Sequence, residues 1–304
     1  MTSAEKAAWR SPDLGTRREL DLPQGRISVF ESGSGPAIVF VHGLLVNANL
    51  WRKPIARLSS EFHCVALDLP LGSHLKPIGD GLDPTAPGLA GLVADALDAL
   101  GLEDVTLVGN DTGGALCQIV VTRRPERVGR LVLTPCDYRD DFPPKMFAYF
   151  KPVAHIPGGL QMMLAPMRLR APRYLPFAFG WLVKRKIDRA AEDSYVYPSL
   201  VIPGVLAEVR RILLALDKSY TNEAADRLGA FTRPALIAWA REDRLFKPAN
   251  GEALARDLGN ARVEWIDDSR TFVAEDNPDR LAELIAGFAR RPEPATPPTT
   301  EQRA

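Results

Sequence analysis

The chain has 304 residues, 46% of them hydrophobic, which is enough for one large α/β domain with an inserted subdomain. Its 38 Lys and Arg equal its 38 Asp and Glu in number, so no net charge favours nucleic acid or an anionic membrane as the main partner. A small, uncharged or weakly charged ligand fits this balance better, and we expect neither nucleic acid nor a membrane as partner.

The compartment follows from the cysteines and from the N-terminus. Cys64, Cys117 and Cys136 are odd in number and lie within apolar runs, which predicts buried thiols in a reducing compartment. The first twenty residues are polar and charged, unlike a secretory signal. No run reaches the roughly 18 consecutive apolar residues of a membrane span. We therefore expect a cytoplasmic protein. The sequence does not indicate its oligomeric state.

The predicted elements begin after a polar leader. Two strands at residues 18–22 and 26–31 flank a Pro-Gln-Gly turn, which predicts a hairpin. Two continuous apolar runs at 37–41 and 62–67 follow, with a helix at 51–58 between them. Such runs are typical of strands that are buried on both faces.

The middle of the chain alternates between helix and strand. Apolar residues at 89–100 recur at the spacing of one helix face, and Gly101 stands where a left-handed C-cap is needed. A strand at 105–108 runs into the turn 109–114 and a second helix, and a strand at 130–134 comes next. This alternation predicts a mostly parallel sheet with right-handed crossovers.

The alternation stops near residue 138, where prolines become frequent and aromatic residues and methionines cluster without strand-like spacing. Strands return at 235–239 and 263–266, and a last helix begins at Pro278 behind an Asn277 cap. The predicted division is an α/β core at residues 1–137 and 232–291, a helical cap at 138–231, and a disordered tail at 292–304.

A candidate site lies at the turn after the strand 105–108. Its glycines permit a tight, strained turn that lifts Asp111 above the carboxyl edge of the sheet. The Thr112 amide lies at a helix N-terminus, where donors are unpaired and the dipole is positive. The loop after residue 41 would direct the Leu44 amide into the same space. Leu44 and Thr112 are therefore the predicted oxyanion donors, although an Asp in such a turn can also serve only as a helix cap.

Five motifs carry a resemblance to a known family, namely Val41–Gly43, Asp68–Pro70, Val108–Gly114, Trp239–Asp243 and Glu275–Pro278. In this order they resemble the α/β-hydrolase superfamily, over about residues 20–290. Asp111 narrows the resemblance to the aspartate-nucleophile branch of haloalkane dehalogenases and epoxide hydrolases. That resemblance implies an α/β-hydrolase fold with an inserted helical cap, and we expect no cofactor and no metal. It also implies a carboxylate that opens a carbon–halogen or carbon–oxygen bond and becomes an alkyl ester.

In that branch a histidine backed by an acid activates the water that cleaves the ester. Asp243, which follows the strand 235–239, matches the acid. The histidine position before Phe272 holds Thr271, and a threonine cannot take a proton from water near neutral pH. His74, in a loop at the carboxyl edge of the sheet, and His155, in the predicted cap, are each either a surrogate base or an ordinary residue.

Two further departures bear on the substrate. Thr112 stands where the resemblance to haloalkane dehalogenases places an indole donor for the halide, which argues against dehalogenation. Epoxide hydrolases use cap tyrosines as donors, although aromatic residues in a cap more often only pack. The cap tyrosines are Tyr149, Tyr174, Tyr195 and Tyr197. The predicted substrate contacts are Leu45, Asn110, Tyr149 and Phe272.

Three functions remain open. The first is a hydrolase acting on a small, largely apolar epoxide, ester or alkyl compound, with Asp111 as nucleophile and the hydrolytic step weakened by Thr271. The second is a lyase, isomerase or cyclase that uses Asp111 as general acid or base. The third is a pseudoenzyme that binds a small apolar ligand, because a fold does not determine a function.

Overall fold

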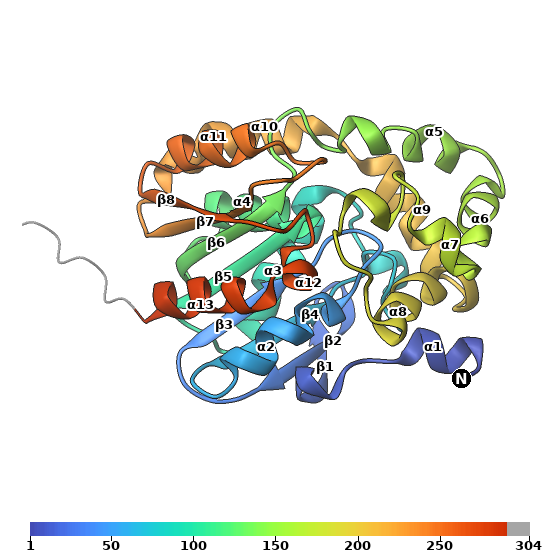
Figure 1. Ribbon diagram of the computed structural model, residues 1–304, viewed down its shortest axis with the longest axis horizontal. Helices are drawn as coiled ribbons and strands as arrows, with labels where there is room; N and C mark the ends of the chain where they lie inside the picture. Colours follow the sequence, from blue (N-terminus) through green and yellow to red (C-terminus); the bar gives the residue numbers. More distant parts are fainter. Residues whose placement is uncertain (291–304) are drawn as a thin grey trace, which may run out of the picture.

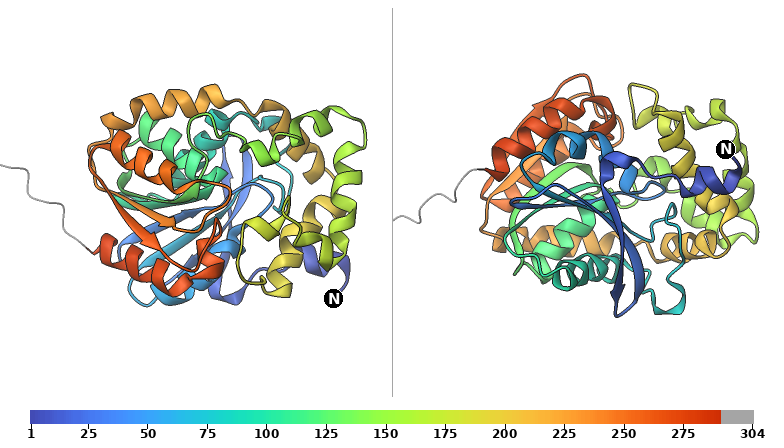
Figure 2. Two further views of the ribbon diagram at one scale, coloured as in Figure 1. Left: turned by 45° about the horizontal axis from the view of Figure 1, so that its top comes forward. Right: turned by 90° about the horizontal axis from the view of Figure 1, so that it is seen from below.

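The computed structural model describes residues 1–290, which form an eight-stranded sheet between two layers of helices, with further helices at one end (Figures 1 and 2). The strands are β1 Thr16–Leu22, β2 Gly25–Ser32, β3 Ala37–Val41, β4 His63–Asp68, β5 Val105–Asp111, β6 Val128–Cys136, β7 Ala235–Ala240 and β8 Ala261–Ile266. Their order is β1-β2-β4-β3-β5-β6-β7-β8. Only the β1–β2 and β2–β4 pairs are antiparallel, so the predicted α/β-hydrolase fold with a mostly parallel sheet is confirmed.

The helices of the core cover both faces of the sheet. They are α2 Arg52–Leu58, α3 Ala86–Ala99, α4 Thr112–Arg123, α10 Lys218–Arg227, α11 Pro248–Leu258 and α13 Pro278–Ala289. The helices α2 and α13 pack together on one face, whereas α3, α4, α10 and α11 form a continuous layer on the other. Gly101 follows α3 with φ 64°, which is the left-handed conformation expected of it.

The segment between β6 and α10, which we call the cap, is helical and lies beyond one end of the sheet (Figure 1). Its helices before α10 are α5 Phe150–His155, α6 Gly159–Leu164, α7 Arg170–Arg173, α8 Arg189–Val201 and α9 Val205–Ala215, with short 3-10 turns between them. The helix α10 packs against α4 of the core. The division at residues 138 and 231 therefore stays a prediction, and the predicted tail at 292–304 lies outside the described residues.

The polar leader is more ordered than the sequence pattern predicts. Residues Ser3–Ala8 form α1, because Thr2 and Glu5 make a capping box that satisfies amides at the start of the helix. The helix α1 packs against α8, and Lys6 lies 3.5 Å from Asp193. The missed signal was the Thr2 to Glu5 spacing, which the absence of an apolar face obscured.

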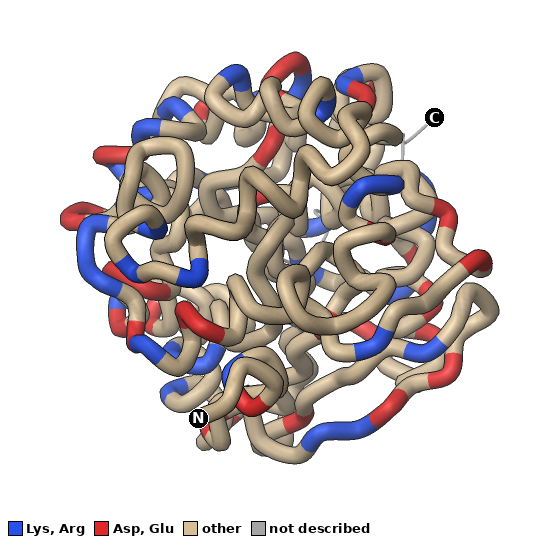
Figure 3. The backbone as a smooth tube through the Cα atoms, turned by 90° about the vertical axis from the view of Figure 1, so that its right-hand side faces the viewer, with Lys and Arg blue, Asp and Glu red and all other residues tan. Residues whose placement is uncertain are grey.

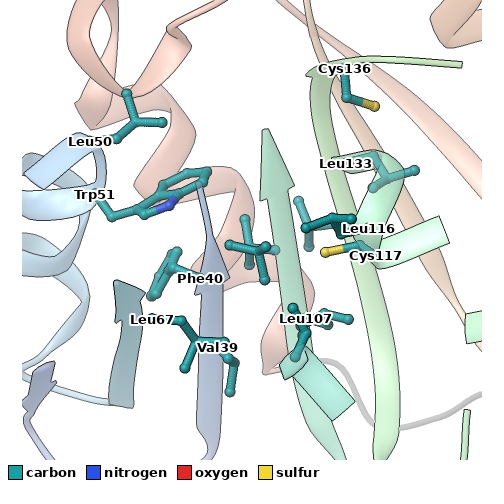
Figure 4. Packing of buried hydrophobic residues seen from close by; sticks show 14 of the residues in the cluster. Val39, Phe40, Leu50, Trp51, Leu67, Leu107, Leu116, Cys117, Leu133 and Cys136 are labelled. Carbon is teal, nitrogen blue, oxygen red and sulfur yellow. The ribbon is translucent and has the colours of Figure 1, made fainter. Parts of the chain in front are cut away.

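The core is built from the central strands. Val39 and Phe40 of β3, Leu67 of β4 and Leu107 of β5 are fully buried, as their apolar runs predict (Figure 4). The rings of Phe40 and Trp51 lie 5.2 Å apart, so the segment before α2 is packed onto the sheet. The three cysteines are free and buried, as expected. Among residues 1–290, no helix has the length and hydropathy that a membrane crossing requires.

Candidate active site

Asp111 lies at the junction of β5 and α4 with φ 55° and ψ −133°, a conformation that costs energy for any residue other than glycine. The turn needs small neighbours as well. A Cβ atom on Gly113 would lie 2.4 Å from the carbonyl oxygen of Val41, closer than real Cβ contacts allow. The glycines therefore permit the close approach of β3 and α4 that holds the strained turn.

The loop after β3 packs directly on the Asp111 side chain. A Cβ atom on Gly43 would lie 2.5 Å from the Cβ atom of Asp111, so a glycine is required there. The backbone amide of Thr112 donates to Oδ1 of Asp111 over 2.5 Å, and the Thr112 hydroxyl donates to the same oxygen over 3.1 Å. The oxyanion roles of Leu44 and Thr112 stay predictions, but both residues lie beside Asp111.

Asp111 opens into a covered cavity of about 140 Å³. Its wall is almost entirely apolar and comes largely from the cap and from the loop after β3. The predicted site residues that line it are Leu44, Leu45, Asp111, Thr112, Tyr149 and Phe272. The cavity therefore suits a small, largely apolar molecule, which would meet the Asp111 carboxyl group at one end of the cavity.

A second carboxyl group, that of Asp137, lines the same cavity. Asp137 follows Cys136, the last residue of β6, and Cys136 is the register partner of Asp111. The side chain is only 1% exposed, and its Oδ1 has no hydrogen-bond partner within residues 1–290. The sequence motifs did not single out Asp137. The available signal was an acid placed directly after the strand that neighbours β5.

The two cavity carboxyls influence each other. Burial raises the pKa of Asp111 to about 6, although the hydrogen bonds from Thr112 oppose the rise. Burial, and next the charge of Asp111, raise the pKa of Asp137 well above its usual value, while a Thr112 hydrogen bond lowers it. Like charges in an apolar cavity repel, so the pair loses its two protons in separate steps. The pair can therefore hold a carboxylate and a carboxylic acid at the same time.

Asp243 and Thr271 are in contact, as their positions in the sequence predict. Asp243 follows β7, and its Oδ1 accepts a hydrogen bond from the Thr271 hydroxyl over 3.2 Å. The same oxygen accepts from the amides of Leu245 and Phe246, both over 2.7 Å. Burial raises the pKa of Asp243 to about 7. Neither Asp243 nor Thr271 lines the cavity, but Phe272 does.

The predicted substrate contact of Asn110 does not match its place in the structure. Asn110 is buried and is not among the residues that line the cavity. Its Nδ2 donates to the Thr134 hydroxyl and to the backbone oxygens of Pro135 and Thr271. Asn110 therefore connects the end of β6 to the Thr271 loop.

His74 does not reach the cavity either, which removes its proposed role as surrogate base. Its ring is buried, with Nε2 2.9 Å from a carboxylate oxygen of Glu208 on α9. Its Nδ1 accepts from the amide of Gly72 over 3.3 Å. His74 lies in a loop, but its contact with Glu208 of α9 holds the ring outside the cavity that Asp111 lines.

The remaining histidines also lie elsewhere. His155 is exposed at the end of α5, and His63 pairs with Glu31 on the sheet. The His42 ring donates to the Gly43 carbonyl and accepts from the Leu69 amide, and burial lowers its pKa to about 4. No imidazole lines the cavity in the described part of the chain.

The cap tyrosines divide into two groups. Tyr149 and Tyr195 line the cavity, whereas Tyr174 and Tyr197 do not. The Tyr195 hydroxyl bonds to Glu275 over 3.2 Å, and the Tyr149 hydroxyl donates to the Phe177 carbonyl over 3.3 Å. Both hydroxyls are thus engaged with protein groups. Within residues 1–290, no cluster of three or more His, Cys, Asp or Glu is arranged to hold a metal ion.

Similarity to known proteins extends over most of the chain. Residues 38–284 match a family model described as "Alpha/beta hydrolase family". Haloalkane dehalogenase 2 of Mycobacterium tuberculosis (strain H37Rv) is 27% identical over 275 residues, covering 88% of this chain and 93% of its own. The uncharacterized hydrolase YugF of Bacillus subtilis (strain 168) is 24% identical over 278 residues, covering 86% and 92%. A mutant of haloalkane dehalogenase DatA from Agrobacterium tumefaciens C58 superposes with a TM-score of 0.74 at 23% identity, over 93% of this chain and 100% of its own.

Proposed function

Because the chain belongs to the alpha/beta hydrolase family, we propose that it opens a small, largely apolar electrophile with the carboxylate of Asp111 as nucleophile. An epoxide is the favoured substrate class, and an activated ester or alkyl compound is the wider one. The observation that supports the proposal most is the pair of carboxyls, Asp111 and Asp137, in one apolar cavity. One can attack carbon while the other supplies a proton.

The wall of the cavity argues against a halide as leaving group. The relatives named above include haloalkane dehalogenases, yet no tryptophan lines the cavity within residues 1–290, so no indole N–H faces a departing halide. An oxygen leaving group instead needs a proton, which a carboxylic acid can donate. The high pKa of Asp137 suits this role.

In the first step an oxygen of the Asp111 carboxylate forms a bond to an epoxide carbon. The carbon–oxygen bond of the ring breaks, and its electron pair stays on the ring oxygen. That oxygen takes the proton of the Asp137 carboxyl. The products are a hydroxyalkyl ester on Asp111 and a carboxylate on Asp137.

In the second step water adds to the ester carbonyl carbon of Asp111, and a diol leaves. One proton of the water passes to the Asp137 carboxylate and the other to the alkoxide oxygen that leaves, which restores the starting protonation state of both carboxyls. Esterification removes the charge of Asp111 that helps to raise the pKa of Asp137, so Asp137 is a weaker base in this step than in the free pair. Thr271 cannot supply the imidazole used by the family that this chain resembles. The second step is therefore slow, and the ester accumulates.

Intact-mass measurement tests this proposal. The protein is incubated with a panel of aryl and alkyl terminal epoxides, and we expect a mass increase equal to that of the epoxide, located on Asp111 by peptide mapping. The adduct should decay slowly after the free epoxide is removed, with release of the diol. Absence of an adduct across epoxides, activated esters and alkyl halides would contradict the nucleophilic role.

Replacing Thr271 by His should shorten the lifetime of the adduct by about 100-fold, because an imidazole beside Asp243 can take a proton from water. The site is fully buried, so the larger ring costs about 1–3 kcal/mol of stability. Thermal unfolding establishes which preparations are folded. The control is Thr271→Val, which has nearly the same shape but no base and should leave the lifetime unchanged. A folded Thr271→His protein with an unchanged lifetime counts against this role of position 271.

A second function is favoured by the same carboxyl pair. A carboxylate and a carboxylic acid in one apolar cavity can move a proton between two atoms of a substrate without forming an ester, as an isomerase or lyase requires. The mass measurement separates the two cases. Turnover with no adduct, lost in Asp111→Asn, supports the proton-transfer function. Ligand binding with neither turnover nor adduct supports a binding protein.

A further inference from the structure

Exposed apolar side chains are concentrated on one part of the cap. The structure exposes six large hydrophobic side chains within residues 1–290, and five of them lie between residues 156 and 177. They are Ile156, Met162, Leu169, Leu175 and Phe177, which we call the outer cap face. Met162 is 75% exposed and Leu169 is 67% exposed. Scattered exposed apolar residues are ordinary, but a concentration of this kind marks an interaction surface.

The segment that carries the outer cap face is rich in basic residues, half of which pair with carboxylates from elsewhere in the chain. Residues 142–187 contain eight Lys and Arg and no Asp or Glu, so the rest of the chain has 30 basic residues against 38 acidic ones. The total charge of zero conceals this separation. Figure 3, which views this side of the molecule, shows largely uncharged chain across the middle and charged residues toward the edges.

Several of these cations are directed to solvent. Lys145, Arg168 and Lys186 are exposed and form no ion pair with a carboxylate of residues 1–290. Arg170 and Arg173, by contrast, pair with the buried Glu192 of α8. The outer cap face is therefore an apolar centre with unpaired positive charge beside it.

The outer cap face is also the outer side of the cavity wall. Phe177 lines the cavity and is 45% exposed. Met163 lines the cavity, while its neighbour Met162 points to solvent, and Met167 lines it next to the exposed Arg168. One short segment thus presents apolar groups both to the cavity and to the exterior.

We propose that the outer cap face docks on an anionic lipid surface, from which the cavity takes its apolar substrate. Apolar side chains that enter the interface, together with Lys and Arg facing anionic headgroups, give binding of this type. A second copy of the chain fits less well, because the same cations would meet across the interface. The uptake of substrate from the lipid surface rests on the proposed function, whereas docking on that surface does not.

The sequence-based expectation of no membrane partner used the total charge alone. A lipid surface responds instead to the charges within about one Debye length, roughly 8 Å at physiological ionic strength. The exposed cations of the cap that pair with no carboxylate of residues 1–290 are therefore the charges that matter for binding. Docking at a surface also needs no membrane-spanning helix.

Co-sedimentation with large unilamellar vesicles tests the proposal on the full chain at physiological ionic strength. We expect binding to vesicles of phosphatidylglycerol and phosphatidylcholine in equal parts, and at least about tenfold weaker binding to pure phosphatidylcholine. Arg168→Glu with Lys186→Glu should lower the affinity by at least about tenfold, since each cation near an anionic surface contributes about a fivefold effect. Met162→Ser with Leu169→Ser should lower it similarly through the lost apolar contact.

The matched control is Lys247→Glu with Arg256→Glu, which makes the same charge change near and on α11, away from the cap. This variant should bind as the wild type does. No binding to the anionic vesicles, or an equal loss in the control, would overturn the proposal. Self-association that is abolished by the Met162 and Leu169 changes, without vesicle binding, would overturn it in favour of a dimer interface.

Failure of the proposed function remains distinguishable from failure of docking. Vesicle binding is measured on Asp111→Asn as well, because a variant at the end of β5 leaves the outer cap face intact. Docking without any adduct on wild-type Asp111 would contradict the function alone. For the wild type, an epoxide with a long alkyl chain should react faster when it is carried in anionic vesicles than in phosphatidylcholine vesicles, and the Arg168 and Lys186 changes should remove that difference.

Discussion

Replacement of Asp111 by Asn abolishes the covalent adduct and lowers turnover by at least about 1,000-fold, if the carboxylate attacks carbon as proposed. An amide oxygen is a poor nucleophile, and residues that act covalently show losses of this size or larger. Intact mass and diol release, measured on one preparation, check both parts of the prediction.

The Asp111→Asn change should leave the fold intact. Asparagine tolerates positive φ better than most residues, and φ is 55° here. Its Oδ1 can still accept from the Thr112 amide, while a buried charge is removed. We therefore expect a melting temperature at neutral pH no lower than that of the wild type. A folded Asp111→Asn protein that still forms the adduct, with no Asp regenerated by deamidation, would show that another residue is alkylated.

Replacement of Asp137 by Asn should slow formation of the adduct by about 100-fold or more, the usual size of a general-acid contribution. An amide cannot protonate the oxygen that leaves the epoxide carbon. Decay of the adduct should slow too, because the same group takes the proton from water. Single-turnover kinetics with an aryl epoxide measures the two steps separately. The control is Asp141→Asn. This change removes a neighbouring charge that raises the pKa of Asp137, but it leaves the Asp137 carboxyl group in place.

The pH dependence identifies the two roles. Below pH 6 Asp111, with its pKa raised to about 6, takes up a proton and loses its nucleophilicity, so the rate of adduct formation falls on the acid side. As pH rises through the higher pKa of the pair, Asp137 loses its proton and the rate falls again. In Asp137→Asn the acid limb should stay near pH 6, because burial causes that shift, and the alkaline limb should disappear. An unchanged alkaline limb would assign the acid to another group.

The sequence predicts much of the fold because local patterns encode it. Strands buried on both faces are continuous apolar runs, so the runs at 37–41, 105–108 and 235–239 each marked a strand. The helix at 89–100 was visible from its spacing and its terminal glycine. The helix α1 was missed because its stability comes from a two-residue cap and from packing on α8.

The candidate site was only partly predictable. Asp111, Thr271 and Asp243 could be assigned because each follows a strand in a motif whose order is visible in the chain. Asp137 was missed because its meaning depends on which strands are neighbours. The error for Asn110 came from its contacts with Thr134, Pro135 and Thr271, which only the folded chain brings together. The role predicted for His74 was wrong because its ring is held by a contact with Glu208, which lies 134 residues away in the chain.

By itself the sequence determined the alternation of strands and helices, the strained turn at Asp111, and a threonine before Phe272. The tertiary structure alone decided that Asp137 shares the cavity with Asp111, that no histidine enters it within residues 1–290, and that the exposed apolar side chains are concentrated on one part of the cap. The physical reason is the range of the interactions. Backbone preferences and apolar periodicity act over a few residues, whereas the composition of a cavity, pKa shifts and the exposure of side chains depend on distances that only the folded chain defines.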